Sequence, residues 1–590
     1  MARNGRPGSV GTVETRMATI ALPAGGLQLE SGGSLPELQV AYETYGTLAP
    51  NRDNVVVICH ALSGDAHVAG YHADSDDKPG WWDEMVGPGK GIDTDRMFVI
   101  CSNILGGCKG TTGPASINPQ TGRPYGSSFP SYTIGDMVNV QRLLLQHLGI
   151  EQVAAVIGGS LGGMQVLEWG IRFPAMVKRC ICIASAVSLS AQALAFDIVG
   201  RSAIVSDPNW QGGDYYGSGR TADVGLAQAR MIGHITYLSP EIMTKKFGRE
   251  KQETELAPAS RFGTEFQVES YLRYQGSKFV DRFDANSYLH ITHAMDAYDL
   301  IEKHGSLQAA FRDVQARFLV VALSSDWLFP PEQSLEIASG LLAAGKRVSY
   351  CLLQAPHGHD AFLVEIAHLA EAVRSFLASA DVPDEPPEQI SAAHGDYGLI
   401  EQIVAPGSRV LDLGCGDGEL LALLTKRRQV SGLGMDIDLR RAINAMGRGI
   451  DVLQGDIDEG LPLIPPKSYD YVILSETLQV VRKPRLVLNE MLRIADRGIV
   501  TFPNFANWSH RLQLGLLGRM PKSGSLPFNW YDTPNIHLAT LKDFVDLCRQ
   551  DGIRITRLVG ISGGAINRLF LALGMNNLGA DRVVVEVTRA

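Results

Sequence analysis

A serine framed by glycines stands at a strand-to-helix junction in the first third of the chain. Gly158-Gly159-Ser160-Leu161-Gly162 follows the apolar run Val153-Ala154-Ala155-Val156-Ile157 and precedes a stretch with helical patterning, Met164 to Trp169. A sharp turn of this kind exposes a serine hydroxyl, and it needs glycines because it leaves no room for side chains. The free N–H groups at the start of the helix favour negative charge beside Ser160. The pattern predicts a nucleophilic serine at the edge of a sheet.

An acid and two histidines follow further along the chain. They come after two apolar segments that read as buried strands: Arg317 to Leu323 before Ser324-Ser325-Asp326, and Val348 to Leu353 before Pro356-His357-Gly358-His359-Asp360. Such groups meet at the carboxyl ends of parallel strands, and the order serine, acid, histidine is that of the α/β-hydrolase fold. A histidine would take the proton of Ser160, and Asp326 would orient the imidazole. Spacing alone leaves both His357 and His359 open.

An oxyanion hole requires two N–H donors near the serine. One should be the backbone of Leu161, the residue after the nucleophile. The second should come from the loop after an early strand, and Val55 to Cys59 is followed by His60-Ala61-Leu62-Ser63-Gly64. We assign the second donor to the backbone of Leu62. We expect His60 to have a structural role, because it precedes that loop.

Composition limits the remaining possibilities. A chain of 590 residues should hold two or three domains, and its 45% hydrophobic and 20% charged residues are those of a globular protein. A net charge of −10 without basic stripes argues against nucleic-acid binding. The polar N-terminus lacks a signal-peptide core and no apolar run is long enough to span a bilayer, so we expect a cytoplasmic protein. The eight scattered cysteines indicate neither a metal site nor structural disulfides.

Two interruptions of the strand–helix alternation define the organisation. Residues 1–16 read as a flexible arm, and an α/β-hydrolase domain is expected over residues 17–378. Within it, residues from about 190 to 310 are mostly helical and would form a lid over the active site. A proline- and acid-rich linker covers residues 379–393, and a second α/β domain covers residues 394–590.

The first domain resembles the MetX-type homoserine O-acetyltransferases. The segments that carry the resemblance are His60-Ala61-Leu62-Ser63-Gly64, Trp81-Trp82, Gly158 to Gln165, Asp207-Pro208-x-Trp210, Ala229 to Tyr237, Tyr271-Leu272-x-Tyr274-Gln275-Gly276, Arg282 to Tyr288, Ser325 to Phe329 and Gly358 to Leu363. The resemblance implies acetyl transfer from acetyl-CoA to the hydroxyl of L-homoserine, through an acetylated Ser160 in a ping-pong scheme. It also implies that His359, in Gly-His-Asp, is the catalytic histidine, and that the protein is a homodimer joined through the lid. No cofactor is required, since acetyl-CoA is a substrate.

Homoserine is a zwitterion, and its recognition needs charges of both signs. The resemblance places Arg230 against its carboxylate and Asp360 against its ammonium group. The alternatives are a solvated lid arginine and a helix N-cap before Ala361. A succinyl donor would bring a further carboxylate that needs a cation near the catalytic acid, and Trp327-Leu328-Phe329 offers none, so the sequence favours acetyl.

The second domain begins with the pieces of a Rossmann-like methyltransferase fold. Val410 to Leu413 precedes the glycine-rich turn Gly414-Cys415-Gly416-Asp417-Gly418, and a second strand ends in an acid, Asp436. Asp436 would bind the ribose hydroxyls of a nucleoside. Gln454-Gly455-Asp456-Ile457 follows a third strand and could meet the adenine, and Ser468 to Leu474 is the expected fourth strand. The candidate S-adenosylmethionine residues are Asp412, Gly414, Gly416, Asp436 and Asp456.

Residues 394–590 resemble MetW, a methyltransferase-like protein associated with homoserine acyltransferases. The resemblance implies a supporting or regulatory role, with S-adenosylmethionine as a candidate ligand. Ser475-Glu476-Thr477 and Asn504 onward are candidate acceptor-side groups, but loop packing explains them better. The alternatives are a succinyl-CoA-using acyltransferase, an esterase or thioesterase fused to an active methyltransferase, and a scaffold with a degenerate hydrolase fold. The intact serine, aspartate and histidine weigh against the scaffold.

Overall fold

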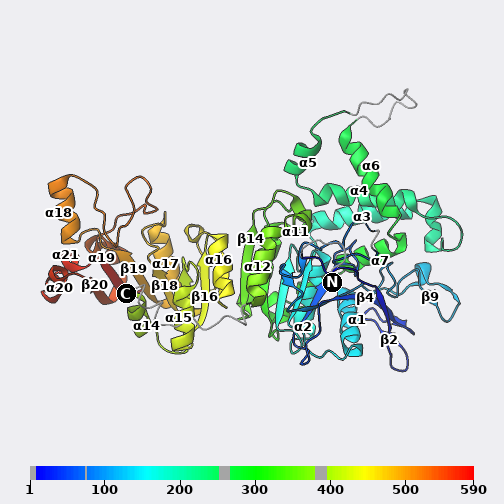
Figure 1. The fold of residues 1–590 in the computed structure, drawn as a ribbon, viewed down its shortest axis with the longest axis horizontal. Coiled ribbons are helices and arrows are strands. Elements are labelled where there is room, and N and C mark those ends of the chain that lie inside the picture. Colours follow the sequence, from blue (N-terminus) through cyan, green and yellow to red (C-terminus); the bar gives the residue numbers. More distant parts are fainter. Residues whose placement is uncertain (1–7, 74–75, 77, 252–265, 379–394) are drawn as a thin grey trace. The chain divides into compact units, whose positions relative to one another are not determined.

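The chain folds into two compact units, residues 1–377 and residues 378–590. A computed structural model describes residues 8–73, 76, 78–251, 266–378 and 395–590 (Figure 1). The predicted linker at residues 379–393 lies outside the described residues. The α/β fold class is confirmed for both units.

An eight-stranded sheet forms the centre of the first unit. Its spatial order is β1 (Arg16–Thr19), β4 (Gln39–Tyr45), β8 (Phe98–Ser102), β5 (Val55–Cys59), β11 (Ala155–Gly159), β12 (Arg179–Ile183), β13 (Arg317–Leu323) and β14 (Val348–Leu353). From β8 to β14 neighbouring strands are parallel, and β1 and β4 form an antiparallel edge. The strands β5, β11 and β13 are buried along their whole length, which explains their nearly continuous apolar sequences.

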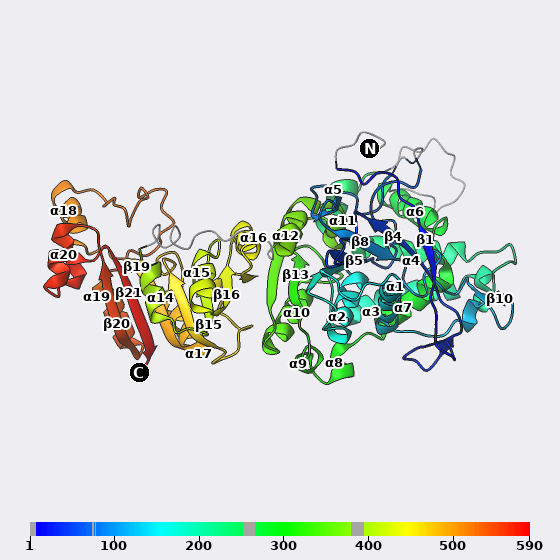
Figure 2. The same ribbon diagram turned by 60° about the horizontal axis from the view of Figure 1, so that its bottom comes forward.

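Helices flank this sheet (Figure 2). Those outside the insertion are α1 (Ile134–His147), α2 (Leu161–Arg172), α8 (Leu300–His304), α9 (Leu307–Ala310), α10 (Pro331–Ala343), α11 (Ala361–Val364) and α12 (Ile366–Ala378). Small elements complete the unit: the strand pairs β2 (Leu27–Gln28) with β3 (Ser34–Leu35), β6 (Val86–Gly87) with β7 (Ile92–Asp93) and β9 (Ile117–Asn118) with β10 (Arg123–Pro124), and the 3-10 turns η1 (Gly126–Ser128) and η3 (Gly358–Asp360).

Most of the segment between β12 and β13 is a helical insertion, which precedes α8 and α9. It contains α3 (Ala191–Val205), η2 (Pro208–Gly213), α4 (Asp223–Tyr237), α5 (Pro240–Phe247), α6 (Gln267–Val280) and α7 (Ala285–Asp296). These helices have their own buried cluster, which includes Ile204, Leu226, Phe279 and Tyr288. Figure 1 shows them together beyond one end of the sheet, and α4 packs against the catalytic turn η3. The insertion therefore covers the end of the sheet where η3 lies.

The flexible arm predicted over residues 1–16 is wrong for its second half. Thr12 bridges to Tyr71, the Val13 N–H donates to the Tyr71 carbonyl oxygen at 2.9 Å, and Thr15 Oγ1 donates to Glu43 at 2.7 Å. Polar composition suggested a free arm, but these hydrogen bonds and the buried Glu43 carboxylate hold residues 8–16 against the first unit.

The second unit is built on a seven-stranded sheet with helices beside it. The order is β17 (Asp451–Gln454), β16 (Ser431–Asp436), β15 (Arg409–Leu413), β18 (Tyr469–Ser475), β19 (Ala495–Pro503), β21 (Arg582–Arg589) and β20 (Ile553–Ile561). The first five strands are parallel and β21 runs antiparallel to both neighbours. The remaining elements are α14 (Tyr397–Ile403), α15 (Glu419–Arg428), α16 (Leu439–Gly447), η4 (Ile457–Glu459), α17 (Pro484–Ile494), α18 (Trp508–Leu517), α19 (Leu541–Gln550), α20 (Ala565–Ala572) and α21 (Asn576–Gly579). The carboxyl ends of β15, β16 and β17 meet at one edge, as a Rossmann-like sheet requires.

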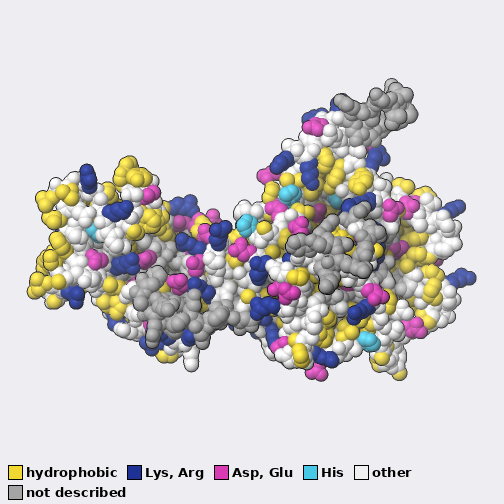
Figure 3. Space-filling view, in the orientation of Figure 1, with side chains coloured by type: hydrophobic (Ala, Val, Ile, Leu, Met, Phe, Trp, Pro, Cys, Tyr) yellow, Lys and Arg dark blue, Asp and Glu magenta, His cyan; other side chains and the backbone are white. Residues whose placement is uncertain are grey.

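Large hydrophobic side chains are exposed at α18, α20 and the loop after α18. Leu516 and Leu517 at the end of α18 are 74% and 67% exposed, and Trp530 and Tyr531 are 75% and 71% exposed. Figure 3 shows hydrophobic side chains gathered where α18 and α20 lie.

No described helix is long and apolar enough to cross a membrane. All eight cysteines are free thiols, as expected.

Candidate active site

Ser160 occupies a strained turn between β11 and α2. Its φ of 58° and ψ of −126° lie outside the ordinary regions for a residue with a side chain. The turn is held by the Ser160 N–H, which donates to the Ile183 carbonyl oxygen at 3.0 Å, and by the Ser185 hydroxyl, which donates to the Ser160 carbonyl at 2.8 Å. A Cβ on Gly162 would lie 2.1 Å from the Cys59 carbonyl oxygen. Glycine at position 162 is therefore required by the close approach of β5, whereas a Cβ on Gly159 would meet the Phe362 ring at 2.7 Å.

His359 and Asp326 form the second half of the catalytic group. His359 Nδ1 lies 2.6 Å from Asp326 Oδ2, while the N–H groups of Leu328 and Phe329 donate to Oδ1 at 3.0 and 2.9 Å. Burial lowers the pKa of His359, but the charge and hydrogen bond of Asp326 outweigh burial and raise the pKa above its usual value. His359 lines the same pocket as Ser160. Asp326 engages Nδ1 of His359, which leaves Nε2 of His359 for Ser160.

The other two histidines near the site have different partners. His357 pairs with Glu365, the residue between α11 and α12, through a short contact and a 3.1 Å hydrogen bond from its backbone N–H. His60 is buried, its Nδ1 lies 2.8 Å from the Ala61 carbonyl oxygen, and its Nε2 accepts from the Ile104 N–H at 3.2 Å. These contacts orient loops, so the geometry favours His359 as the base.

The two backbone donors assigned to the oxyanion hole lie beside Ser160. Leu161 is the first residue of α2, and Leu62 lines the same pocket as Ser160. In the part of the chain that the structure describes, neither N–H donates a hydrogen bond to another protein group. Both donors are therefore available to an oxygen that becomes negatively charged at Ser160.

The pocket holds charged groups of both signs from different elements. Its volume is about 520 Å³, and Ser160, Arg230, His359 and Asp360 all line it. Arg230 on α4 donates to the Ser63 hydroxyl at 3.2 Å, with its guanidinium 5.3 Å from the Tyr237 ring centre. Asp360 makes no side-chain capping hydrogen bond to α11, so the N-cap alternative lacks its defining contact. Burial raises the pKa of Asp360 more than His359 and Arg230 lower it.

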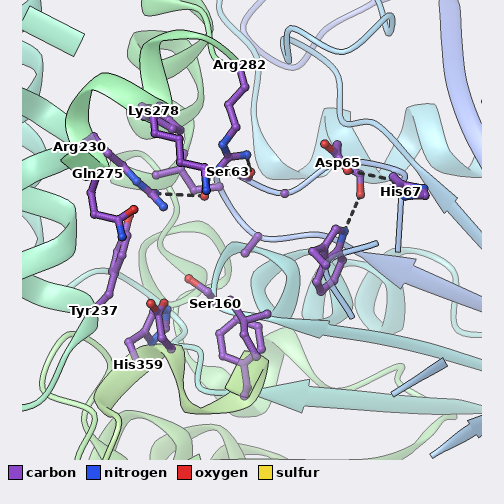
Figure 4. A pocket seen from close by; sticks show the side chains of 18 of the residues that line it. Ser63, Asp65, His67, Ser160, Arg230, Tyr237, Gln275, Lys278, Arg282 and His359 are labelled. Carbon is purple, nitrogen blue, oxygen red and sulfur yellow. Dashed lines mark hydrogen bonds between the residues drawn. The ribbon is translucent and has the colours of Figure 1, made fainter. Parts of the chain in front are cut away.

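Three further cationic residues line this pocket and were missed from the sequence: Lys78, Lys278 and Arg282. Lys278 lies near the end of α6 and Arg282 just after it. Figure 4 shows Arg230, Lys278 and Arg282 on one side of the pocket, with Ser160 and His359 across from them. Their positions depend on how α6 packs on α4, which no local motif reveals.

A group of metal-ligand type lies beside the pocket. Atoms of Glu43, His67 and His72 lie within 4.8 Å of one another, a spacing that would suit an ion. Glu43 already accepts hydrogen bonds from Thr15 at 2.7 Å and Tyr45 at 2.8 Å, in addition to its contacts with both histidines. Burial raises the pKa of Glu43, but these hydrogen bonds outweigh it and lower the pKa to about 2. We assign the group to holding His67 in the pocket wall.

Two glycines and two acids lie together at the predicted nucleotide edge of the second unit. Gly414 has a φ of 75°, and a Cβ there would meet the Thr477 side chain at 2.4 Å, whereas the space around Gly416 is open. Asp412 is buried with its Oδ1 unpartnered, and burial and then Asp436 raise its pKa to about 7. Asp436 Oδ2 accepts from the Gly416 N–H at 2.9 Å.

The third acid of this edge has a different partner. Asp456, after β17, contacts Arg482 at 2.5 Å and accepts from the Asp458 N–H at 2.9 Å. Both Asp436 oxygens are also occupied by backbone N–H groups, since Oδ1 accepts from Asp438 at 2.9 Å. A ribose at this edge would have to share or displace these hydrogen bonds.

A serine on a strained turn, an Asp-His pair and two free N–H donors at one sheet edge define an α/β-hydrolase-type acyl-transfer site. A family model described as alpha/beta hydrolase fold matches residues 54–366, and one described as methionine biosynthesis protein MetW matches residues 394–584. The bifunctional methionine biosynthesis protein MetXA/MetW of Rhodopirellula baltica is 45% identical over 537 residues, which are 89% of this chain and 86% of that protein. The chain belongs to this bifunctional MetXA/MetW family.

Proteins that are similar to the first unit alone are named for different activities. The homoserine O-acetyltransferase of Methanosphaerula palustris is 54% identical over 64% of this chain and 76% of its own length. The homoserine O-succinyltransferase of Halothiobacillus neapolitanus is 51% identical over 66% of this chain and 96% of its own length. Among solved structures, the homoserine O-acetyltransferase of Bacillus anthracis has a TM-score of 0.58 at 29% identity, covering 62% of this chain and 98% of that one. Esterase E22 has a TM-score of 0.57 at 32% identity, covering 62% of this chain and all of its own.

Proposed function

We propose that the first unit transfers an acetyl group from acetyl-CoA to the hydroxyl of L-homoserine. The observation that carries this proposal is the presence of both a cation, Arg230, and an acid, Asp360, in the pocket that Ser160 and His359 line. A zwitterionic acceptor needs a cation for its carboxylate and an anion for its ammonium group, and simple ester hydrolysis needs neither. Two homoserine O-acetyltransferases among the similar proteins support the same acceptor.

The mechanism follows a ping-pong scheme. His359 removes the Ser160 proton as the hydroxyl oxygen attacks the thioester carbonyl, and the Leu62 and Leu161 N–H groups stabilise the oxyanion. Collapse breaks the carbon–sulfur bond, His359 returns the proton to the CoA sulfur, and acetyl-Ser160 remains. His359 then deprotonates the homoserine hydroxyl, which attacks the carbonyl of the acyl-serine. The bond from the acyl carbon to Ser160 Oγ breaks, and His359 returns the proton to Oγ, which restores the Ser160 hydroxyl. Every step uses side chains and backbone groups of this chain alone.

The test is the release of free thiol from acetyl-CoA with and without homoserine. Transfer predicts release that depends on homoserine and matches the O-acetylhomoserine formed. Thiol release at full rate without homoserine would instead favour a thioesterase. This is the second candidate function, and the similarity of the first unit to esterase E22 supports it. Succinyl-CoA assayed beside acetyl-CoA decides the donor, because relatives of both kinds are similar to this chain.

Turnover should fall at acidic pH with a midpoint above the usual histidine value of about 6.5. Only neutral His359 accepts the Ser160 proton, and Asp326 raises the pKa of His359, so protonation inactivates the base at a higher pH than in a free histidine. The measurement is kcat/KM for acetyl-CoA between about pH 5 and 9. An acid limb centred below about 6 would contradict the assignment.

We further propose that the second unit supports or regulates acyl transfer and binds S-adenosylmethionine at Asp412, Gly414, Gly416, Asp436 and Asp456. The unpartnered Asp412 oxygen and the open space at Gly416 support a polar ligand at this edge. Isothermal titration of the full chain should give binding heat that Asp436→Ala removes and Asp496→Ala, a surface change on β19, retains. Absence of heat with the unaltered chain would remove S-adenosylmethionine from the proposal.

We also propose that the protein is a homodimer joined through the lid. Ile198 and Val199 on α3 and Val224 on α4 are all more than half exposed, which supports a covered apolar face. Sedimentation equilibrium should give twice the chain mass, and Val199→Glu should reduce it. A monomer at every concentration would contradict this.

A further inference from the structure

The cationic wall of the pocket, Arg230, Lys278 and Arg282, carries more positive charge than the acceptor requires. Homoserine has one carboxylate, and Arg230 is already assigned to it under the proposed function. Arg282 and Lys278 line the same cavity from the far end of α6. Figure 4 shows the Arg282 guanidinium directed toward the Ser63 segment, beside Lys278. The acyl donor is the remaining substrate that must enter this pocket.

Two guanidinium groups are held close together around shared groups. The Arg230 guanidinium lies 4.7 Å from the Phe279 ring centre and that of Arg282 lies 5.3 Å from it. Arg230 donates to the Ser63 hydroxyl at 3.2 Å, and Arg282 donates to the Ser63 carbonyl oxygen at 2.9 Å. Like charges that share these neighbours repel one another, and an anion bound between them would relieve that repulsion.

In the described part of the chain, no carboxylate forms a direct ion pair with this wall. Within the described ranges, none of Arg230, Lys278 and Arg282 has an acidic oxygen within 4.0 Å. Burial and then the charge of Arg230 lower the pKa of Arg282, and Asp65 offsets this only in part. Burial, Arg230 and Arg282 together lower the pKa of His234, one turn along α4, to about 3. The cationic wall of the pocket therefore has a positive potential that attracts anions.

We propose that Arg282, with Lys278 beside it, binds an anionic group of the acyl donor and leaves Arg230 to the acceptor. The assignment rests on the proposed function, because it assumes an acyl-CoA donor and a homoserine acceptor. Two sources supply such an anion: a phosphate of CoA, or the terminal carboxylate of a dicarboxylic acyl chain. An arginine fork suits either group, and a nearby lysine adds charge without directional demands.

The test compares Arg282→Met and Lys278→Met with Arg273→Met. Arg273 lies on the same helix but is exposed and paired with Glu269, so it controls for a lost α6 charge. Steady-state KM values are measured for acetyl-CoA, succinyl-CoA, acetyl-pantetheine (a thioester without phosphates) and homoserine. Losing a charge-assisted contact should raise the donor KM roughly tenfold or more for Arg282→Met, and less for Lys278→Met.

The donors separate the two sources. A phosphate site predicts higher KM for both CoA thioesters and an unchanged KM for acetyl-pantetheine. A carboxylate site predicts a loss with succinyl-CoA and none with the two acetyl donors. Arg282→Lys should restore part of either loss, and unchanged thermal unfolding would exclude a folding defect. KM values like those of Arg273→Met, or an increase for homoserine only, would overturn the inference. Absence of acylhomoserine from the unaltered enzyme with every donor would instead overturn the proposed function.

Discussion

Ser160→Ala should abolish thiol release from acetyl-CoA, with or without homoserine. The change removes the only atom that becomes acylated in the proposed scheme, and the loss should be on the order of 10⁴-fold or more. The residue at position 160 has a φ of 58°, which is as strained for serine as for alanine. Alanine is also no larger than serine, so the change should introduce no new contact in the turn. The measurement is thiol release together with the mass of the acid-quenched enzyme.

The control is Ser202→Ala, a change on the outer face of α3 where the hydroxyl bonds only the Ile198 carbonyl oxygen. That variant should keep the turnover of the unaltered chain and the added acetyl mass on the peptide with Ser160. Product that accumulates while this peptide carries no acyl mass would contradict the covalent scheme. A direct transfer between the two bound substrates would then have to replace it.

The sequence predicted the elements that carry the triad because their signals are local. The expected strands at Val55 to Cys59, Arg317 to Leu323 and Val348 to Leu353 have those bounds in β5, β13 and β14. Each is a short apolar run that ends in a polar loop, as a strand buried on both faces requires. Ser160 and Asp326 follow such runs directly, so their shared position at the sheet edge could be inferred.

The pocket wall could not be predicted in the same way. Arg282 and Lys278 lie more than a hundred residues from Ser160 along the chain, within a helical insertion. The helical pattern of that insertion does not indicate where it packs on the sheet. Their position depends on the packing of α4 with α6 around Phe279. In the sequence, only Trp327 to Phe329 can be recognised as neighbours of the catalytic acid. The cations Arg282 and Lys278 come from the lid, and they could not be weighed when acetyl was favoured over succinyl.

The second unit shows a similar division. The glycine-rich turn and the acid after the second strand were evident from the sequence, since β15 and β16 have regular strand–turn patterns. The hydrogen bonds of Asp436 to two backbone N–H groups were not, because they depend on the conformation of the turn itself. The antiparallel β20 and β21 were also unassigned, since their pairing joins segments at the far end of the chain.

His359→Gln should reduce turnover by about as much as Ser160→Ala, on the order of 10³- to 10⁴-fold. Glutamine retains much of the volume and polarity of histidine but cannot accept a proton at neutral pH, so Ser160 keeps its hydroxyl and loses its base. The measurement is the rate of the first acylation in a single turnover with acetyl-CoA. Slow residual acylation should rise with pH without the acid limb expected for the unaltered enzyme.

His357→Gln is the matched control, because this histidine lies two residues away and pairs with Glu365 outside the catalytic group. It should keep most of the activity and the same pH profile, since the Asp326–His359 contact of 2.6 Å is untouched. A larger loss in His357→Gln than in His359→Gln would reverse the assignment. A pH profile that moves only in His357→Gln would do the same, because the group that titrates in the profile is the one that takes the proton from Ser160.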